Sequence, residues 1–174
     1  NAAGMKPELA EELQEELARL TRYVENALTI ARAERGGLEL HPEPLELKEF
    51  LNDMLELISR LAQTEGRRLL WSCPAGIVVQ VDRSLLKQIL FNLLSNALKH
   101  GEQDILLRVH QHRGNVSLLL GNRVAARTQT SRQGLSIGLR LVQALACQMK
   151  QTRIGFRRQG FFWVRLQLPP GEKP

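Results

Sequence analysis

Two asparagines and a lysine lie on one face of a predicted helix, within the segment QILFNLLSNALKHG (residues 88–101). At about 100° per residue, Gln88, Asn92, Asn96 and Lys99 fall within roughly 80° of one another. A solvent-facing stripe would explain polar residues, but asparagine inside a helix is less favourable than alanine, glutamate or lysine. An amide oxygen can ligate a hard cation without adding charge, and a nearby lysine can contact the phosphates that the cation bridges. The stripe therefore favours a cation and phosphate site, with a solvent face as the alternative.

A glycine pair precedes another predicted helix, in the segment QGLSIGLRLV. Gly134 and Gly138 stand where the helix begins, so backbone N–H groups and the positive end of the helix dipole are available to a phosphate. A helix cap with close packing would explain the two glycines equally well.

The asparagine stripe is positioned by a helix predicted over residues 83–100, with Asp82 as its N-cap. The apolar positions of this helix adjoin the stripe, and we expect them to pack against a sheet. They are Leu86, Ile89, Leu90, Leu93, Leu94 and Ala97.

A long helix is predicted from Pro7 to about Arg35, ended by the glycines of RGG. It carries one apolar seam, which predicts a helix of a bundle completed by another chain. The seam consists of Leu13, Leu17, Leu20, Val24, Ala27 and Ala31. The segment LELHPEPLEL follows as an extended connector, since each proline disfavours helix in the residue before it.

The remaining segments predict helices at about 47–63 and 135–150, together with six strands. The strands are predicted at 67–73, 76–81, 104–112, 115–122, 151–156 and 161–168. They come as pairs joined by the turns PAG, RGN and RRQG, with a helix between successive pairs. This order predicts an α+β fold in which helices cover one face of a mixed sheet.

Charge is divided unevenly along the 174 residues. Residues 1–104 hold 12 Lys+Arg and 17 Asp+Glu, a balance of −5, whereas residues 105–171 hold 11 Lys+Arg and no acidic residue. The second part should attract anions. A solvated basic surface, phosphate ligands, nucleic acid or an acidic protein partner would each fit. Two distant cysteines and no long apolar run indicate a reduced, cytoplasmic protein without a membrane span.

Several of these segments resemble sensor histidine kinases of two-component systems. LLKQILFNLLSNALKHG resembles their N-box, and GLSIGLRLVQALACQMKQTRIGFRRQGFFWVRLQLP resembles their second glycine box, last helix and closing hairpin. ARLTRYVENALTIARAERGGLELHPEPLELKEFL resembles the second helix of the dimerisation domain and its linker. The resemblance covers about residues 15–169. It implies a dimerisation-helix fragment with linker at 1–41 and a catalytic ATP-binding domain at 42–174, a two-layer Bergerat-type sandwich with three helices on one face.

The resemblance also implies ATP and Mg²⁺ as cofactors and assigns site residues. Asn96 is the implied Mg²⁺ ligand, Asn92 lines the phosphate and metal side, Lys99 contacts phosphate and His100 flanks the nucleotide. The glycine-box residues implied to border the triphosphate are Gly134, Gly138 and Leu139.

One box departs from the family pattern. The family has Asp-x-Gly-x-Gly after the strand corresponding to VSLLL, and its aspartate accepts a hydrogen bond from the adenine amino group. Asn122, Val124 and Ala126 align with it here. A neutral acceptor is roughly half as strong as a charged one, so we expect ATP affinity to be about five- to thirtyfold lower. The branched Val124 would also occupy space that a glycine leaves for the base.

The phosphoacceptor motif of the family is not found in the chain. None of His41, His100, His110 or His112 stands in a His-Glu/Asp-Leu-Arg-x-Pro setting. We therefore expect the chain to begin after the first dimerisation helix, to supply Mg-ATP for transfer to a histidine outside it, and to be inactive alone.

Three functions follow from these observations. The first is the catalytic region of a sensor histidine kinase, the cytoplasmic part of an inner-membrane sensor, with a second protomer and a response regulator as partners. The second keeps the fold without the chemistry, as a nucleotide-impaired, dimerising scaffold or phosphatase-biased module. The third, a nucleic-acid surface, is disfavoured because the arginines are spread over strands and loops, so no nucleic-acid partner is expected.

Overall fold

A computed structural model of the chain describes residues 7–124, 137–149, 152–158 and 161–172. Its elements follow one another in the predicted order, apart from one additional short strand. They are α1 (Pro7–Glu34), β1 (Glu43–Glu46), α2 (Leu47–Thr64), β2 (Leu69–Ser72), β3 (Val78–Val81), α3 (Arg83–His100), β4 (Gly101–His112), β5 (Asn115–Val124), α4 (Ile137–Gln148), β6 (Arg153–Arg158) and β7 (Phe161–Leu168).

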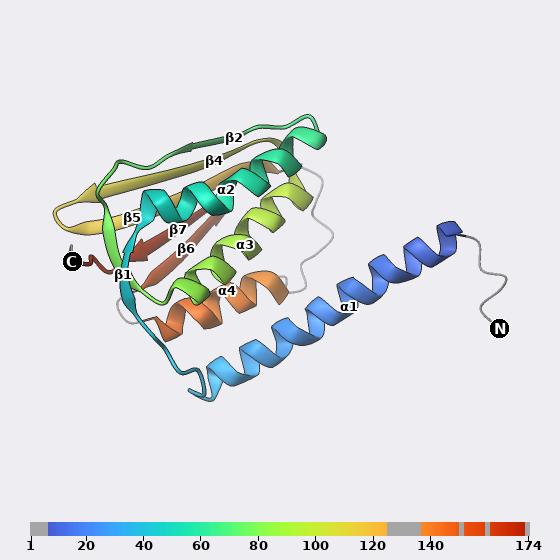
Figure 1. Cartoon of the computed structure of the whole chain (residues 1–174), viewed down its shortest axis with the longest axis horizontal. Coiled ribbons are helices and arrows are strands. Elements are labelled where there is room, and N and C mark those ends of the chain that lie inside the picture. The colour runs from blue at the N-terminus through green and yellow to red at the C-terminus, as the bar shows by residue number, and fades with distance from the viewer. Residues whose placement is uncertain (1–6, 125–136, 150–151, 159–160, 173–174) are drawn as a thin grey trace.

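The main sheet has five strands in the order β2-β4-β5-β7-β6. β2 and β4 are parallel and the other neighbouring pairs are antiparallel, so the sheet is mixed. Helices α2, α3 and α4 cover one face of it, as Figure 1 shows. The predicted fold class, an α+β sandwich preceded by a long helix, is confirmed.

Helix α3 lies over the sheet and begins and ends where the sequence predicts. Its N-cap is Asp82, whose carboxylate accepts a hydrogen bond from the backbone N–H of Leu85 at 3.0 Å. The apolar face is buried because every third or fourth residue is leucine, isoleucine or alanine. Its buried side chains are Leu85, Leu86, Ile89, Leu90, Leu93, Leu94 and Ala97, which include all six predicted positions.

The expectation that all strands pair as hairpins is wrong for the first two predicted strands. β4–β5 and β6–β7 do form antiparallel hairpins, but β2 pairs in parallel with β4, and β3 pairs with β1 in a separate two-stranded sheet. The connector was predicted only as an extended segment. Its prolines keep it extended, and an extended segment beside an unpaired strand edge satisfies its backbone groups by pairing, here with Glu43 opposite Val81.

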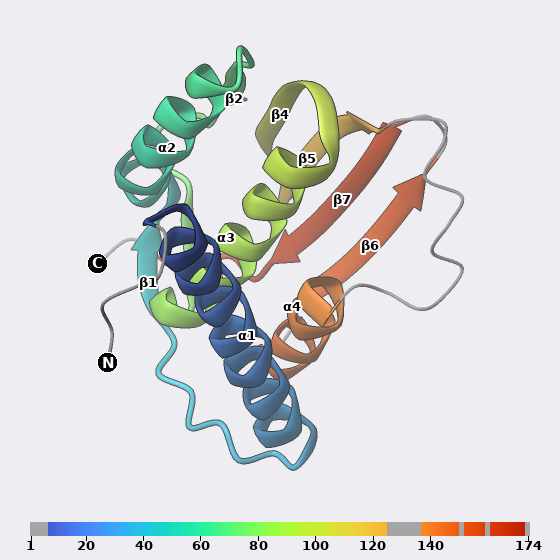
Figure 2. The ribbon, with the colours of Figure 1, turned by 90° about the vertical axis from the view of Figure 1, so that its right-hand side faces the viewer.

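Helix α1 leaves its predicted apolar seam exposed. The exposed large aliphatic side chains of α1 are Leu9, Leu13, Leu17, Leu20, Val24 and Leu28, between 46% and 62% exposed. A different face, with the buried Ile30 and Ala33, packs against α4. Figure 2 shows α1 running beside α4 on the side away from the sheet. The sequence predicted the seam but not this second contact face.

The sheet face opposite the helices holds a close contact between β5 and β7. Gly121 stands opposite Trp163, and a Cβ atom on Gly121 would lie 2.3 Å from the Trp163 ring. Phe161 stacks beside Trp163, with ring centroids 6.2 Å apart. The absence of a side chain at residue 121 is therefore what lets the indole lie against the strand.

Candidate functional site

Gly138 meets the asparagine stripe where α4 begins beside the middle of α3. A Cβ atom on Gly138 would lie 3.3 Å from Asn96 Nδ2 and 3.6 Å from both Asn92 Oδ1 and Asn96 Oδ1. The structure thus brings together three predicted site residues from two helices. Without a side chain, Gly138 leaves a small cradle between the two amides and the first turn of α4.

The two amides present different groups to this cradle. Asn92 Nδ2 donates to the backbone oxygen of Gln88 at 2.9 Å, so its oxygen is the free end that faces Gly138. Asn96 Nδ2 is buried and has no partner within the described part of the chain. The first N–H groups of α4 also lack partners within their own helix. Together these groups can hold an anion and contribute amide oxygen to a cation.

The other predicted residues of the phosphate side lie around these three. Lys99 and His100 are exposed in the last turn of α3, one turn beyond Asn96. Leu139 is half-buried and packs against the hydrophobic core. Gly134 lies outside the described residues, so its predicted role stays a prediction.

Asn122 lies on β5 and points toward the helices, because it follows the strand alternation of Leu118 and Leu120. Its side chain is buried, at 2% exposure. Its Oδ1 has no partner among the residues that the structure describes, and Nδ2 donates to the Arg123 oxygen at 3.5 Å, the long end of hydrogen-bond range. The backbone of Val124 continues β5 opposite Gly101, while its side chain and Ala126 fall outside the description.

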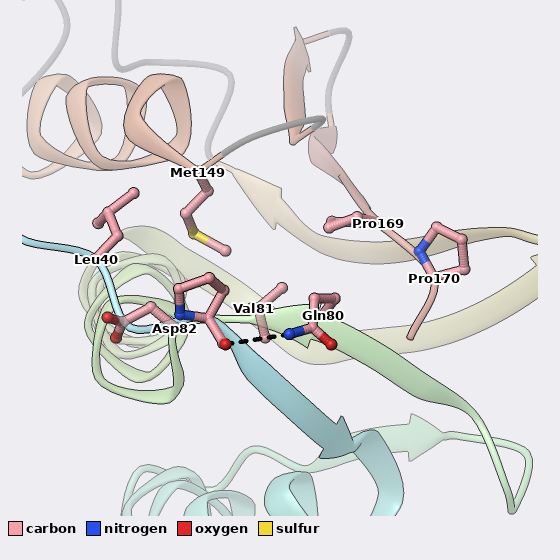
Figure 3. A pocket seen from close by; sticks show the side chains of 8 residues that line it. Leu40, Gln80, Val81, Asp82, Met149, Pro169 and Pro170 are labelled. Atoms are coloured by element: carbon pink, nitrogen blue, oxygen red, sulfur yellow. Dashed lines mark hydrogen bonds between the residues drawn. The ribbon is translucent and has the colours of Figure 1, made fainter. Parts of the chain in front are cut away.

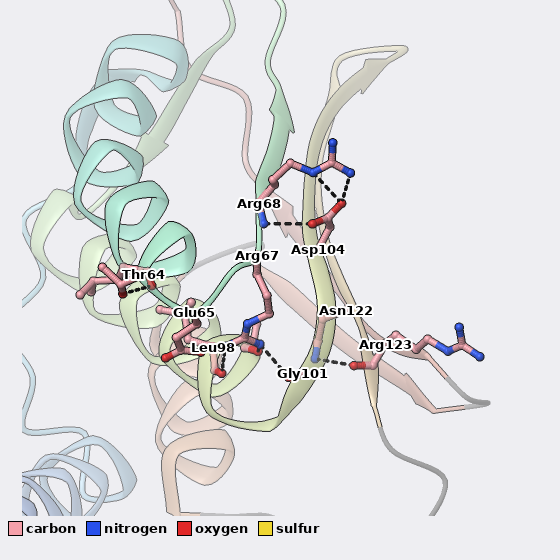
Figure 4. Close-up of polar contacts among 11 residues, drawn as sticks. Thr64, Glu65, Arg67, Arg68, Leu98, Gly101, Asp104, Asn122 and Arg123 are labelled. Atoms are coloured by element: carbon pink, nitrogen blue, oxygen red, sulfur yellow. Dashed lines mark hydrogen bonds and ion pairs between the residues drawn. The ribbon is translucent and has the colours of Figure 1, made fainter.

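Arg67 is a buried charged residue beside Asn122 that the sequence analysis did not identify. It is 8% exposed, donates to the backbone oxygens of Leu98 and, at 2.7 Å, Gly101, and pairs with Glu65. Figure 4 shows its guanidinium under the end of α3. It therefore occupies carbonyls that a helix C-terminus leaves without partners. A signal was present, since an arginine two residues before the inward-facing Leu69 should also face inward.

The ends of α3 and β5 meet at Gly101. A Cβ atom there would lie 2.5 Å from the Ala97 oxygen, 2.8 Å from Asn122 Nδ2 and 3.2 Å from Arg67 Nη1. Residue 101 must stay small because three polar groups converge on it. The same contact places the Asn122 amide close to the guanidinium.

Asp82 connects the linker to the head of α3. One carboxylate oxygen accepts from Leu85 N, and the other accepts from His41 N at 3.0 Å. Burial raises the pKa of Asp82, but hydrogen bonds from the backbone N–H groups of His41, Leu85 and Ser84 outweigh it and lower the pKa below the ordinary value. The ionised carboxylate is thus the form that the folded chain favours.

Comparison with known proteins identifies the family. No family model matches the chain. The probable sensor protein PcoS of Escherichia coli is 30% identical over 123 residues, which are 70% of this chain and 26% of PcoS. The sensor histidine kinase MtrB of Mycobacterium tuberculosis is 32% identical over 106 residues, 59% of this chain and 19% of MtrB. The chain belongs to the sensor histidine kinases. It spans about a quarter or less of these relatives' length.

Solved structures agree on the fold of this histidine kinase catalytic region. The Acinetobacter baumannii histidine kinase AdeS has a TM-score of 0.79 at 18% identity, over 97% of this chain and 87% of that one. ShkA in complex with AMPPNP has a TM-score of 0.75 at 21% identity, over 98% of this chain and 41% of ShkA. Histidine kinase ThkA in complex with response regulator protein TrrA has a TM-score of 0.74 at 17% identity, over 98% and 53%.

Carboxylates and thiolates do not form a metal cluster in the described part of this kinase region. No group of three or more His, Cys, Asp or Glu side chains there could hold a metal ion. A cation near α3 would rely on amide oxygens and on the oxygens of its own ligand.

None of the helices in the described segments is long and apolar enough to cross a membrane.

A pocket of about 400 Å³ lies elsewhere on the kinase region, between the linker, β3 and the segments that follow α4 and β7. Leu40, Met149 and Pro169 line it, and Gln80 Nε2 donates to the Pro42 oxygen at its edge (Figure 3). Its lining is mainly apolar and contains none of the predicted site residues. It is therefore not the candidate site at α3 and α4.

Proposed function

We propose that this histidine kinase region binds ATP with Mg²⁺ and presents it to a phosphoacceptor histidine outside the chain. The observation that supports the proposal is the cradle at Gly138, bordered by the oxygen of Asn92 and the buried Nδ2 of Asn96, neither of which has a hydrogen-bond partner among the described residues. A buried donor without a partner is unfavourable unless a ligand satisfies it. A phosphate oxygen is the acceptor that suits this position at a helix start.

The residues of the chain then have distinct roles. Asn96 and Asn92 bind the cation and the phosphates through their amides, and Lys99 adds a positive charge at the exposed end of α3. The N–H groups at the start of α4 bind a phosphate. Bound Mg-ATP supplies the γ-phosphoryl group, and its transfer depends mainly on positioning and charge neutralisation.

Thermal unfolding of the chain with Mg²⁺ and ATP tests the proposal. A ligand that binds only the folded state raises the free energy of unfolding, by about 2.7 kcal/mol at a ligand concentration of 100 times Kd, and the melting temperature rises with it. We expect this rise in the native chain and its loss in Asn96→Ala. Asn115→Ala is the matched control, since Asn115 is exposed at the far end of β5. No shift at millimolar ATP would contradict the proposal.

A dimerising scaffold without nucleotide binding is the second candidate. The exposed seam of α1 favours it, because six large apolar side chains on one helix seldom remain in water. We propose that a second copy of the chain covers this seam in either case. Leu17→Asp, in the middle of the seam, should shift the chain toward monomer in sedimentation velocity. Unchanged sedimentation would exclude the seam as the contact.

We also propose a response regulator as partner. The complex of ThkA with the response regulator TrrA supports this for a chain of the same fold. The measurement is binding of purified receiver domains to the chain by calorimetry. Absence of binding to every regulator encoded beside the kinase would contradict it.

A further inference from the structure

We propose that this region does not select adenine at Asn122, and that it binds 6-oxopurine nucleotides such as GTP as well as ATP. The inference rests on the proposed nucleotide-binding function and concerns the recognition of the base at Asn122. It identifies the substrate class as purine nucleoside triphosphates rather than ATP alone.

The amide of Asn122 is held weakly at both ends. Its side chain is 2% exposed, yet Oδ1 has no partner among the described residues. The hydrogen bond of Nδ2, to the Arg123 oxygen, has a length of 3.5 Å. A half-turn about the terminal bond would exchange the two ends and lose only this weak contact. The protein therefore does not fix whether an acceptor or a donor faces the base.

Arg67 makes the donor orientation accessible. A Cβ atom on Gly101 would lie 2.8 Å from Asn122 Nδ2 and 3.2 Å from Arg67 Nη1, so the two nitrogens are no farther apart than the sum of these distances. A guanidinium at this range attracts an oxygen and repels an amide NH₂ group. When the oxygen turns toward Arg67, Nδ2 takes the place of Oδ1 and can donate.

The chemistry of purines converts this freedom into broad specificity. Adenine carries an amino group at C6, which donates, while guanine and hypoxanthine carry a carbonyl there, which accepts. A carboxylate can only accept hydrogen bonds, so the carbonyl of a 6-oxopurine would face another acceptor. Such an unpaired contact is what allows a site to discriminate strongly between two bases. An amide serves either base. We therefore expect ATP and GTP to bind with Kd values within about tenfold of each other.

Competition binding to the full chain tests the inference, with a fluorescent ATP analogue displaced by Mg²⁺ complexes of ATP, GTP and ITP. ITP carries the 6-oxo group without the 2-amino group of guanine, so it isolates the contact at C6. We expect all three to displace the analogue within about tenfold of one another. Asn122→Asp restores an obligate acceptor, and should increase the preference for ATP over ITP at least tenfold. Asn115→Asp, on the same strand and exposed, is the matched control and should leave the preference unchanged.

The outcomes separate the inference from the function on which it rests. If the fluorescent ATP analogue itself does not bind the chain, the proposed function fails. If ATP binds while GTP and ITP are each more than tenfold weaker in the native chain, the function stands and the inference is overturned. An Asn122→Asp variant that melts like the native chain but keeps equal affinities also overturns it. Should that variant not fold, the comparison in the native chain decides alone.

Discussion

Replacing Gly138 by alanine should separate folding from nucleotide binding. The new methyl group would stand in the cradle between α3 and α4, 3.3 Å from Asn96 Nδ2 and 3.6 Å from Asn92 Oδ1. Those atoms are the ends of side chains, not backbone, so they can move by the few tenths of an ångström that the closest contact requires. The space the methyl takes is the space we assign to a phosphate oxygen.

Gly138→Ala has two opposing effects on stability, a gain in helix preference and a tighter contact with Asn96, and a separate effect on nucleotide binding. Alanine is favoured over glycine inside a helix by about 1 kcal/mol, less in a first turn, and the tight contact with Asn96 offsets part of this. We expect the free energy of unfolding to change by less than about 1 kcal/mol. Loss of one phosphate position should weaken Mg-ATP binding at least tenfold, or about 1.4 kcal/mol.

Urea unfolding and nucleotide titration on the same preparations measure both effects. Gly155→Ala is the control, because a Cβ atom on Gly155 has open space around it and its backbone has no left-handed φ. It should change neither quantity. Unaltered ATP affinity in Gly138→Ala would refute the assignment of the cradle. A loss of more than about 2 kcal/mol in stability would show instead that the position serves packing.

Three further substitutions test the surrounding structure. Gly121→Ala should destabilise the fold by about 2 to 3 kcal/mol, since its methyl group overlaps the Trp163 ring; a loss under about 0.5 kcal/mol in urea unfolding would contradict this contact. Arg67→Met should cost about 2 to 4 kcal/mol by leaving the carbonyls at the end of α3 unpaired, whereas Arg68→Met, at an exposed ion pair, should barely shift the urea midpoint. Asp82→Asn keeps one side-chain oxygen to accept from Leu85 N in α3, but removes the oxygen that accepts from His41 N in the linker. It should lower the free energy of unfolding by about 1 kcal/mol at neutral pH. Folding lowers the pKa of Asp82 below its ordinary value of 3.8. The stability that the ionised carboxylate contributes is therefore complete above pH 3.8 and is lost as the pH falls through the lower pKa of the folded chain. The stability difference between the native chain and Asp82→Asn should disappear below that lower pKa. A difference that persists in acid would refute that last explanation.

The helical and hairpin elements were predictable because their signals are local. α3 shows the 3.6-residue period with a capping aspartate, and its buried side chains are those that the period selects. The turn between β4 and β5 combines Arg113 and Gly114, both with positive φ, as a tight hairpin requires. Local patterns do not specify strand partners, which is why the pairing of β2 with β4, about 36 residues apart, was missed.

The candidate site could be predicted only in part for a similar reason. Asn92, Asn96 and Gly138 are recognisable by type and spacing, and the structure brings them together. Strand alternation indicates that Arg67 faces inward, but its contacts at the end of α3 are visible only in the structure, because those backbone oxygens lie about 30 residues away in the sequence. The weakly held amide of Asn122 likewise depends on contacts in space. Sequence patterns report residue types, whereas satisfaction of hydrogen bonds is a property of the packed chain.

The contact between Gly121 and Trp163 has a consequence for sequence change over evolutionary time. The indole occupies the volume that any side chain at position 121 would need, 2.3 Å from a Cβ atom there. Position 121 cannot be substituted while tryptophan stays at 163: tryptophan at 163 requires glycine at 121, and a larger residue at 121 requires a smaller ring or none at 163. In related chains the two positions should therefore covary, and a single-step exchange at 121 should be rare unless 163 has changed first.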